Sequence, residues 1–113
     1  MTQSAKPRKR RSDRNHVIYM IENARGEQYI GITVLSFNGN ANRTVSRRVQ
    51  KHVQRAYSES KTWTLCKSFR KYGPEQHTYE ILEIVRGKKQ AHARETELIN
   101  KLQPRLNTFG VRQ

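Results

Sequence analysis

The sequence predicts an α/β (α+β) chain whose elements follow the order β-β-α-α-β-α. Two short apolar runs flank a turn, two segments carry apolar residues at helical spacing, and a third apolar run precedes a last helical segment. In chain order, these elements are expected at about 16–22, 28–33, 44–58, 65–72, 79–85 and 90–103.

The first two runs are typical of a β-hairpin, because both are rich in β-branched and aromatic residues and the segment between them has turn composition. A hairpin centred on Ala24 would place Tyr19 directly opposite Tyr29, whereas one centred on Arg25 would make them diagonal neighbours. In both registers the two phenols share one face, because side chains alternate along a strand. Gly31 beside them offers room for a substrate backbone. The alternative is an ordinary hairpin with tyrosines in the core.

The first helix is expected to begin with Thr44 as its N-cap. Its apolar stripe comprises Val45, Val49, Val53, Ala56 and Tyr57. Arg48, His52 and Arg55 fall along one edge of this stripe. Side chains at such an edge can be held by packing and still reach a cleft. Arg47 faces away, which favours Arg48 as the functional arginine.

The remaining boundaries are predicted from glycine and proline. Gly73, followed by Pro74, ends the second helix, and Pro104 ends the last one. Residues 34–42, with Ser, Gly and three Asn, are expected to form a loop, and residues 86–89 a turn before the last helix.

Glu95 is the most informative carboxylate. The apolar residues of the last helix lie at −4, +3, +4 and +7 from it and are Ala91, Leu98, Ile99 and Leu102. Glu95 therefore faces inward, whereas Glu97 faces outward. A carboxylate on a buried face needs a cation, hydrogen-bond donors or a metal. One interpretation is a structural ion pair with Arg48 or Arg94, and the other is a ligand for Mg²⁺.

Composition limits the partners. The 113 residues support a single domain, and 23 Lys and Arg against 9 Asp and Glu give a formal net charge of +14. Such an excess favours nucleic acid, although a basic ribosome-associated protein or an anionic-membrane binder would show the same excess. Cys66 is the only cysteine, which excludes an intrachain disulfide and predicts a reducing, cytoplasmic location. No apolar stretch approaches membrane-spanning length, so no membrane partner is expected.

Residues 1–15 are expected to form a disordered basic arm, and residues 16–110 the folded domain. We expect the arm to bind phosphates without reading bases, a solubilising tail or an import signal being the alternatives. Its cations are Lys6, Arg8, Lys9, Arg10, Arg11 and Arg14.

Seven motifs in this order resemble those of the GIY-YIG nuclease superfamily, and the resemblance covers almost everything from Val17 to Asn107. They are Val17-Ile18-Tyr19, Tyr29-Ile30-Gly31, Arg48 with His52, the helix at 65–73, the strand at 79–84, the helix with Glu95, and Asn107. The resemblance implies a three-stranded antiparallel sheet flanked by three helices. It also implies a phosphodiester hydrolase with one metal-binding carboxylate.

The resemblance gives each motif a role. Arg48 would neutralise the phosphate oxygens. Tyr19 would be the general base, with Tyr29 positioning the water or the phosphate. A free phenol titrates near pH 10, so nearby positive charge must acidify Tyr19. His52 is the alternative base or a proton relay. Asn107 is expected to orient the site by hydrogen bonding.

Three departures from the family pattern affect this assignment. Val17 replaces the usual glycine, and Ile32 stands where some relatives have a lysine that assists the base, so the site is expected to depend more on His52. The loop at 36–42 reads as an insertion. It leaves the alignment of the arginine open to a shift, with Arg47 and Arg43 as alternatives.

We therefore expect a Mg²⁺-dependent endonuclease, with Mn²⁺ as a substitute, that acts on double-stranded DNA as a monomer or homodimer. A free-standing phage or bacterial nuclease of homing or restriction type is expected, with Arg47 and Arg55 adding DNA contacts to those of the arm. The alternatives are a non-catalytic nucleic-acid-binding module that keeps the fold and a small RNA-associated protein. Glu95 distinguishes a nuclease from these alternatives, since a protein that only binds a polyanion gains nothing from a carboxylate in its cleft.

Overall fold

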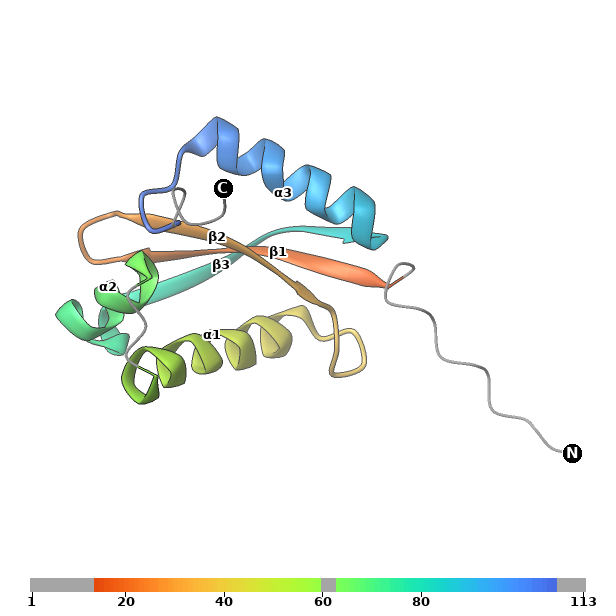
Figure 1. Ribbon diagram of the computed structural model, residues 1–113. Coiled ribbons are helices and arrows are strands. Elements are labelled where there is room, and N and C mark those ends of the chain that lie inside the picture. Colours follow the sequence, from red (N-terminus) through yellow and green to blue (C-terminus); the bar gives the residue numbers. More distant parts are fainter. Residues whose placement is uncertain (1–13, 60–62, 108–113) are drawn as a thin grey trace, which may run out of the picture.

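The computed structural model describes residues 14–59 and 63–107. The described elements are β1 (Asn15–Asn23), β2 (Gln28–Val34), α1 (Ala41–Ser58), α2 (Thr64–Tyr72), the short 3₁₀ helix η2 (Pro74–Gln76), β3 (His77–Arg86) and α3 (Lys88–Leu102). Apart from η2, this is the predicted order β-β-α-α-β-α, which is therefore confirmed (Figure 1). Residue 15, expected at the end of the arm, is already part of β1.

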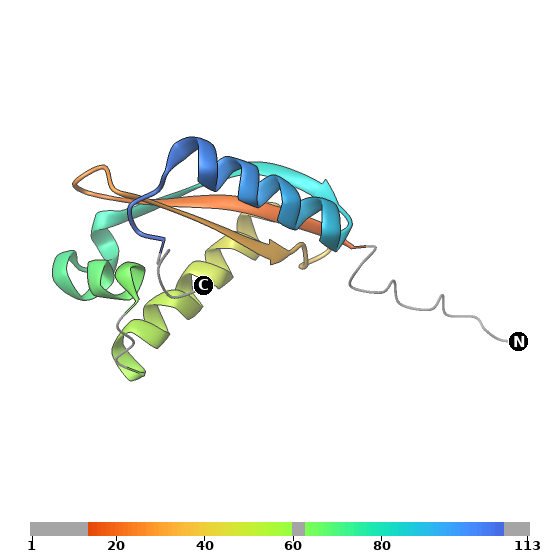
Figure 2. The ribbon, with the colours of Figure 1, turned by 45° about the horizontal axis from the view of Figure 1, so that its top comes forward.

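The three strands form one antiparallel sheet in the order β2-β1-β3. The helix α3 covers one face of this sheet, and α1 and α2 cover the other (Figures 1 and 2). The central strand β1 is consequently buried on both faces, with Val17, Ile18 and Tyr19 fully inaccessible. The strand β2 lies at an edge, which allows helices from both faces to approach it.

The hairpin adopts the register centred on Arg25, with Tyr19 opposite Gly31 and Ile21 opposite Tyr29. The two tyrosines are thus diagonal neighbours on one face, as the second predicted register requires. Asn23 fixes this register, because its side-chain oxygen accepts hydrogen bonds from the backbone N–H groups of Arg25 and Glu27, both at 3.0 Å. Local turn chemistry therefore determines where the two phenols meet.

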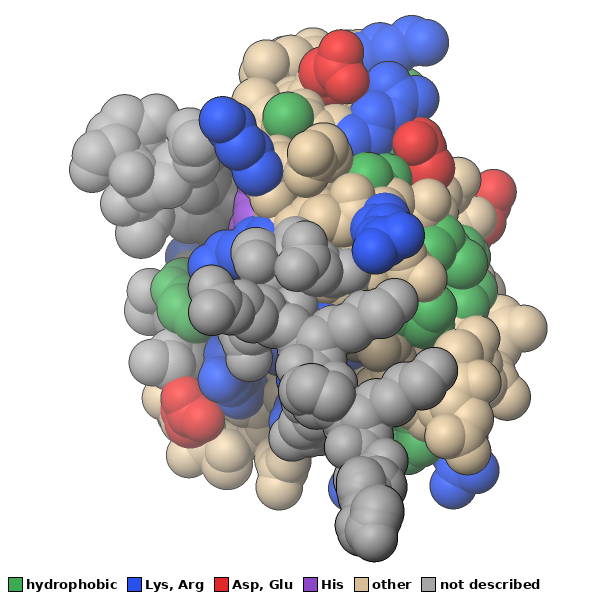
Figure 3. All heavy atoms as spheres, turned by 90° about the vertical axis from the view of Figure 1, so that its right-hand side faces the viewer, with side chains coloured by type: hydrophobic (Ala, Val, Ile, Leu, Met, Phe, Trp, Pro, Cys, Tyr) green, Lys and Arg blue, Asp and Glu red, His purple; other side chains and the backbone are tan. Residues whose placement is uncertain are grey.

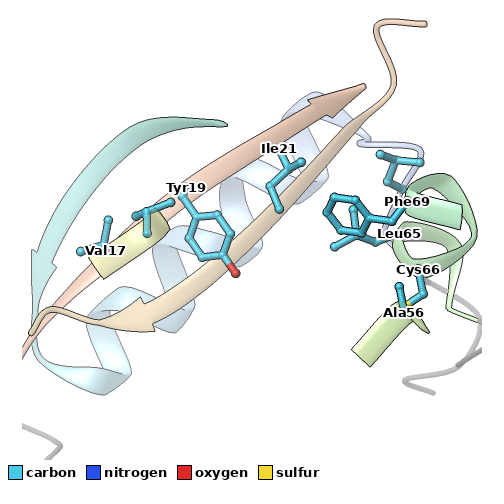
Figure 4. Packing of buried hydrophobic residues seen from close by; sticks show 9 residues of the cluster. Val17, Tyr19, Ile21, Ala56, Leu65, Cys66 and Phe69 are labelled. Atoms are coloured by element: carbon cyan, nitrogen blue, oxygen red, sulfur yellow. The ribbon is translucent and has the colours of Figure 1, made fainter. Parts of the chain in front are cut away.

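The main core lies between the sheet and the α1–α2 pair. Val17, Tyr19 and Ile21 point to the same side of β1 (Figure 4). The buried residues that complete this cluster are Val45 and Ala56 of α1, Leu65, Cys66 and Phe69 of α2, and Leu106. The single cysteine is a buried, unbridged thiol. Tyr19 is therefore part of the core as well as a candidate site residue.

The helix α1 begins one turn earlier than predicted. Asn40 is the N-cap, and its side-chain oxygen accepts from the Arg43 backbone N–H at 3.0 Å. The prediction of Thr44 as the N-cap is wrong. Its hydroxyl instead donates to the carbonyls of Ser36 (3.0 Å) and Asn40 (2.8 Å). Residues 41 and 42, predicted to be loop, are consequently helical.

Two residues predicted to be in the core and one predicted turn also differ from the observed structure. Tyr57 is 52% exposed, because its hydroxyl reaches over α2 to the Phe69 carbonyl at 2.9 Å. Leu102 is 43% exposed in the last turn of α3, just before the left-handed Gln103 where the helix ends. The turn predicted at 86–89 shrinks to Gly87, whose φ of +92° lets α3 follow β3 directly.

Candidate active site

The centre of the site is a buried phenol–imidazole pair. The hydroxyl of Tyr19 lies 2.9 Å from Nε2 of His52, a residue of α1 that is 6% exposed. The ring of Tyr29 meets the ring of His52 edge-on, with centroids 5.4 Å apart, and lies 6.3 Å from the ring of Tyr19. The hairpin and α1 thus bring together three of the predicted site residues.

Gly31 is where the two tyrosines come closest to the backbone. A Cβ atom at this position would lie 2.6 Å from the Tyr19 hydroxyl oxygen and 2.7 Å from Cε2 of Tyr29. Distances this short are inside van der Waals contact, so any side chain at this position would require one or both tyrosine rings to move. The two phenols themselves occupy the room that the sequence suggested for a substrate backbone.

The environment keeps these groups uncharged at neutral pH. Burial raises the pKa of Tyr19, the neighbouring Tyr29 raises it further, and the positive charge of Arg48 opposes both effects. Burial likewise raises the pKa of Tyr29. Burial, followed by the charges of Arg48 and Arg55, lowers the pKa of His52 to about 4. The resting pair is therefore a neutral phenol and a neutral imidazole.

Arg48 connects this pair to the outside. It is half-buried on α1, and its Nε is buried without a hydrogen-bond partner among the described residues. Buried donors are rarely left unpaired, so the group is suited to an anionic ligand. Arg47 is exposed and lines two hollows, one of which it shares with Arg48. Arg48 lines two hollows as well: the shared one and a larger one whose lining does not include Arg47.

The larger of these two hollows wraps around the edge of β2. It has a volume of about 360 Å³ and joins Arg48 of α1 to Lys88 and His92 of α3 across β2; its lining is His16, Ile32, Thr33, Val34, Arg48, Lys88 and His92. Side chains from opposite faces of the sheet can therefore meet there, because β2 has no neighbouring strand on that side.

Glu95 lies on α3 close to this hollow. Its side chain is 18% exposed, compared with 68% for Glu97, which confirms the predicted inward and outward faces. Its Oε1 lies 3.6 Å from Nδ1 of His92, and its charge contributes to the raised pKa values of Tyr19 and Tyr29. Glu95 is thus within electrostatic range of the tyrosine pair.

Asn107 holds the edge of β2 in the manner of a further strand. Its Oδ1 accepts from the Ile30 N–H and its Nδ2 donates to the Ile30 carbonyl, both at 2.9 Å. The adjacent Leu106 N–H donates to the Gln28 carbonyl at 2.9 Å. Ile30 stands between Tyr29 and Gly31, so Asn107 fixes the backbone that positions both.

A comparison with known protein families identifies the family of this chain. The model of the GIY-YIG catalytic domain matches residues 15–108. The chain belongs to the GIY-YIG family. This is a superfamily of nucleases, and the α+β fold described above agrees with it. Neither a curated protein nor a solved structure matches the chain significantly. Among the described residues, no helix has the length and apolar character needed to cross a membrane.

The GIY-YIG site offers few protein ligands for a metal. Within residues 14–59 and 63–107, no group of three or more His, Cys, Asp or Glu is placed to hold an ion. This donor set does not suit structural zinc, which takes four protein ligands. One inward carboxylate suits Mg²⁺, which keeps several waters and binds substrate phosphate. Glu95 therefore fits the ion that the family implies.

The other predicted DNA-binding residues are only partly placed. Lys6, Arg8, Lys9, Arg10 and Arg11 lie outside the described residues. The carbonyl of Arg14 accepts from the Gly87 N–H at 2.9 Å, which ties the start of the domain to α3. Arg55 is 44% exposed and lies 4.0 Å from Glu59. It is near His52 rather than in one of the hollows.

Three residues of the GIY-YIG site were not predicted from the sequence. Lys51 lines a hollow with Arg48, Lys88 lines the one at the β2 edge, and Phe37 lines two hollows beside α1. Lys51 follows Arg48 by three positions, so helical spacing could have indicated it. Lys88 was assigned to a turn, and nothing in the local sequence distinguishes Phe37 from an ordinary loop residue.

Proposed function

We propose that this GIY-YIG protein is a Mg²⁺-dependent endonuclease that hydrolyses phosphodiester bonds in double-stranded DNA. The observation that carries the proposal is the position of Arg48, between the buried Tyr19–His52 pair and the hollow at the β2 edge. Its unpaired Nε and its fork of donors suit a phosphate, whose oxygens would then lie beside the two phenols.

Glu95 completes the site from the opposite face of the sheet. It would hold Mg²⁺ through a carboxylate oxygen, with waters and substrate phosphate as the other ligands. When bound, Mg²⁺ supplies positive charge that stabilises the leaving alkoxide and lowers the pKa of nearby phenol and water. Arg48 neutralises the remaining phosphate oxygens as the fifth bond forms at phosphorus.

The Tyr19–His52 pair provides a route for the proton of the attacking water. In the substrate-free protein, the raised pKa of Tyr19 and the lowered pKa of His52 oppose transfer between them. Burial is the largest cause of the lowered pKa of His52, and a phosphate bound to Arg48 offsets the next one, the positive charge of that arginine. The imidazole then accepts the Tyr19 proton through the 2.9 Å hydrogen bond while Tyr19 takes one from water. Tyr19 is the base in this scheme, and His52 is the relay.

A plasmid assay tests the proposal. Purified protein is incubated with supercoiled DNA in Mg²⁺, in Mn²⁺ and in excess EDTA. Open-circular or linear product is expected with either metal and not with EDTA. Arg48→Lys should slow cleavage by about a hundredfold or more, because it removes the planar fork and the Nε donor. Arg25→Lys, at an exposed position in the hairpin turn, is the matched control.

Binding without cleavage would replace this function with the alternative, a non-catalytic nucleic-acid-binding module. The net charge of +14 is consistent with both. We also propose that the protein has a homing or restriction role in a phage or bacterium. Cleavage at a defined sequence would support it, and unspecific degradation would oppose it.

A further inference from the structure

Phe37 exposes an aromatic ring from a backbone conformation that aromatic residues rarely adopt. It lies in the turn between β2 and α1, is 40% exposed, and has φ of +55°. Asn38 follows with φ of +56° and Gly39 with +83°. The left-handed conformation is unfavourable for a residue with a Cβ, and it persists only where the surrounding structure imposes it. An exposed phenyl ring held in this way indicates a contact that the protein makes with something else.

Hydrogen bonds on both sides hold the turn in place. The Ser36 N–H donates to the Thr44 hydroxyl at 3.1 Å, and that hydroxyl donates back to the Ser36 carbonyl at 3.0 Å. The Gly39 N–H donates to the Ser36 carbonyl at 3.2 Å, and the Asn40 N–H donates to the Phe37 carbonyl at 3.1 Å. The turn also leads directly into α1, because Asn40 is its N-cap. The ring is therefore presented from a fixed position, which lowers the entropic cost of binding.

Cations surround the ring. The Arg43 guanidinium carbon lies 5.0 Å from its centroid. Phe37 lines two hollows, of about 400 Å³ and 280 Å³; Arg43 and Arg47 line the first, and Arg47, Arg48 and Lys51 line the second. No carboxylate belongs to the described lining of either hollow. Where grey atoms do not cover it, the face seen in Figure 3 shows more lysine and arginine than acidic side chains.

We propose that Phe37 stacks on a base of the bound DNA, next to the phosphate that Arg48 holds, and separates that base from its neighbour. A phenyl ring offers nothing to a phosphate, but it matches the face of a base, and flanking arginines bind the strand on either side. Phe37 and Arg48 share one hollow, so the stacked base belongs to a nucleotide close to the reacting phosphate. Apolar side chains that enter a base step in this way also kink the duplex. The inference rests on DNA being the substrate of the proposed function.

The experiment uses duplexes that carry one 2-aminopurine at successive positions, in EDTA so that no strand is cut. The fluorescence of this base rises when it leaves the stack. The wild-type protein should raise it severalfold at one position or a few adjacent ones. Phe37→Ala should remove the rise and weaken DNA binding about tenfold. Phe37→Trp should keep both, because it retains an aromatic face.

The control is Leu102→Ala. Leu102 is similarly exposed, at 43%, but lies at the end of α3 far from the β2–α1 turn (Figure 1). This variant should bind and unstack DNA as the wild type does.

Each outcome separates this inference from the proposed function. A full fluorescence rise with folded Phe37→Ala overturns the stacking and leaves cleavage untouched. A rise that depends on Phe37, in a protein that never cuts with Mg²⁺ or Mn²⁺, supports stacking and overturns cleavage. If Phe37→Ala instead abolishes self-association, measured by sedimentation without DNA, the ring serves a second copy of the chain and the stacking is wrong.

Discussion

Two regions on either side of Arg48 differ in almost every physical property. On the inner side, Tyr19, Gly31 and His52 are buried, uncharged and packed without spare room. On the outer side, Phe37 and the lysine and arginine side chains near it line open hollows. The inner region can place a proton acceptor accurately but cannot attract DNA. The outer region can attract DNA, but the described lining of its hollows contains no carboxylate or imidazole that could take a proton from water.

This difference separates the two kinds of effect that substitutions should have. Inner substitutions should change stability and turnover together, because the same side chains form the core and the site. Outer substitutions should change affinity and its salt dependence and leave the fold intact. Glu95 belongs to neither region, since it approaches from α3 across the β2 edge.

Glu95→Gln should give the largest effect. The substitution nearly preserves volume and removes the inward charge proposed to hold Mg²⁺, so cleavage should fall by at least about a hundredfold. DNA affinity measured without metal should hold or rise, because a negative charge leaves a cationic site. Single-turnover cleavage and equilibrium binding measure the two quantities.

Glu97→Gln is the control for this prediction. Glu97 is 68% exposed on the same helix and lies 3.5 Å from Arg94. Its substitution should leave cleavage close to that of the wild type. Normal cleavage by Glu95→Gln would mean that Glu95 has a structural role and would exclude it as the metal ligand.

Gly31→Ala should be the next most damaging change. The new methyl group would lie 2.6 Å from the Tyr19 hydroxyl oxygen and 2.7 Å from the Tyr29 ring, so one or both phenols must move. Overpacking of this kind destabilises a core by about 1–3 kcal/mol. Urea denaturation should show that loss, together with a loss of cleavage at saturating DNA. Unchanged stability and turnover would show that the tyrosines yield easily and that their packing does not set the site.

His52 should make stability depend on pH. The folded protein keeps His52 neutral down to a pKa of about 4, whereas the unfolded chain protonates it near the ordinary value of 6.5. Between these values the unfolded state binds more protons, so the free energy of unfolding falls as the pH drops from 6.5 to 4, by up to about 3 kcal/mol.

The comparison for this prediction is His52→Gln, which has no imidazole to titrate. The stability difference between the two proteins, followed by urea denaturation, should shrink as the pH falls through this window. A constant difference would mean that His52 does not keep its buried, neutral state.

The sequence was sufficient wherever the controlling interaction is local. Strand parity put Tyr19 and Tyr29 on one face, helical spacing put Arg48 and His52 on one edge, and Gly73 ended α2 as expected. The inward position of Glu95 also followed from helical spacing alone. These features depend on neighbours within one element, which a single sequence displays directly.

The sequence was insufficient to predict features that depend on an interaction between two segments distant along the chain. Asn40 and Thr44 are both good N-caps, and the choice was decided by the hydrogen bonds of Thr44 to Ser36 across the turn. The partner of Asn107 is the backbone of Ile30, 77 residues away in sequence. Likewise, Gly31 is filled by the tyrosine rings only in the observed register and rotamers, neither of which the hairpin pattern specifies.

Removal of the basic arm should have the smallest effect on chemistry, and it tests whether the outer region binds DNA by itself. Deleting residues 1–13 removes Lys6, Arg8, Lys9, Arg10 and Arg11 together with one aspartate. Each phosphate contact contributes about −0.9 to the slope of log K against log salt on duplex DNA, so the slope should flatten by as much as about 4. Turnover at saturating DNA should stay nearly unchanged, since Tyr19, Arg48, His52 and Glu95 are all retained. A collapse of saturated turnover would instead place the arm within the catalytic site. An unchanged slope would mean that the cations around Phe37 and Arg48 make the phosphate contacts without the arm.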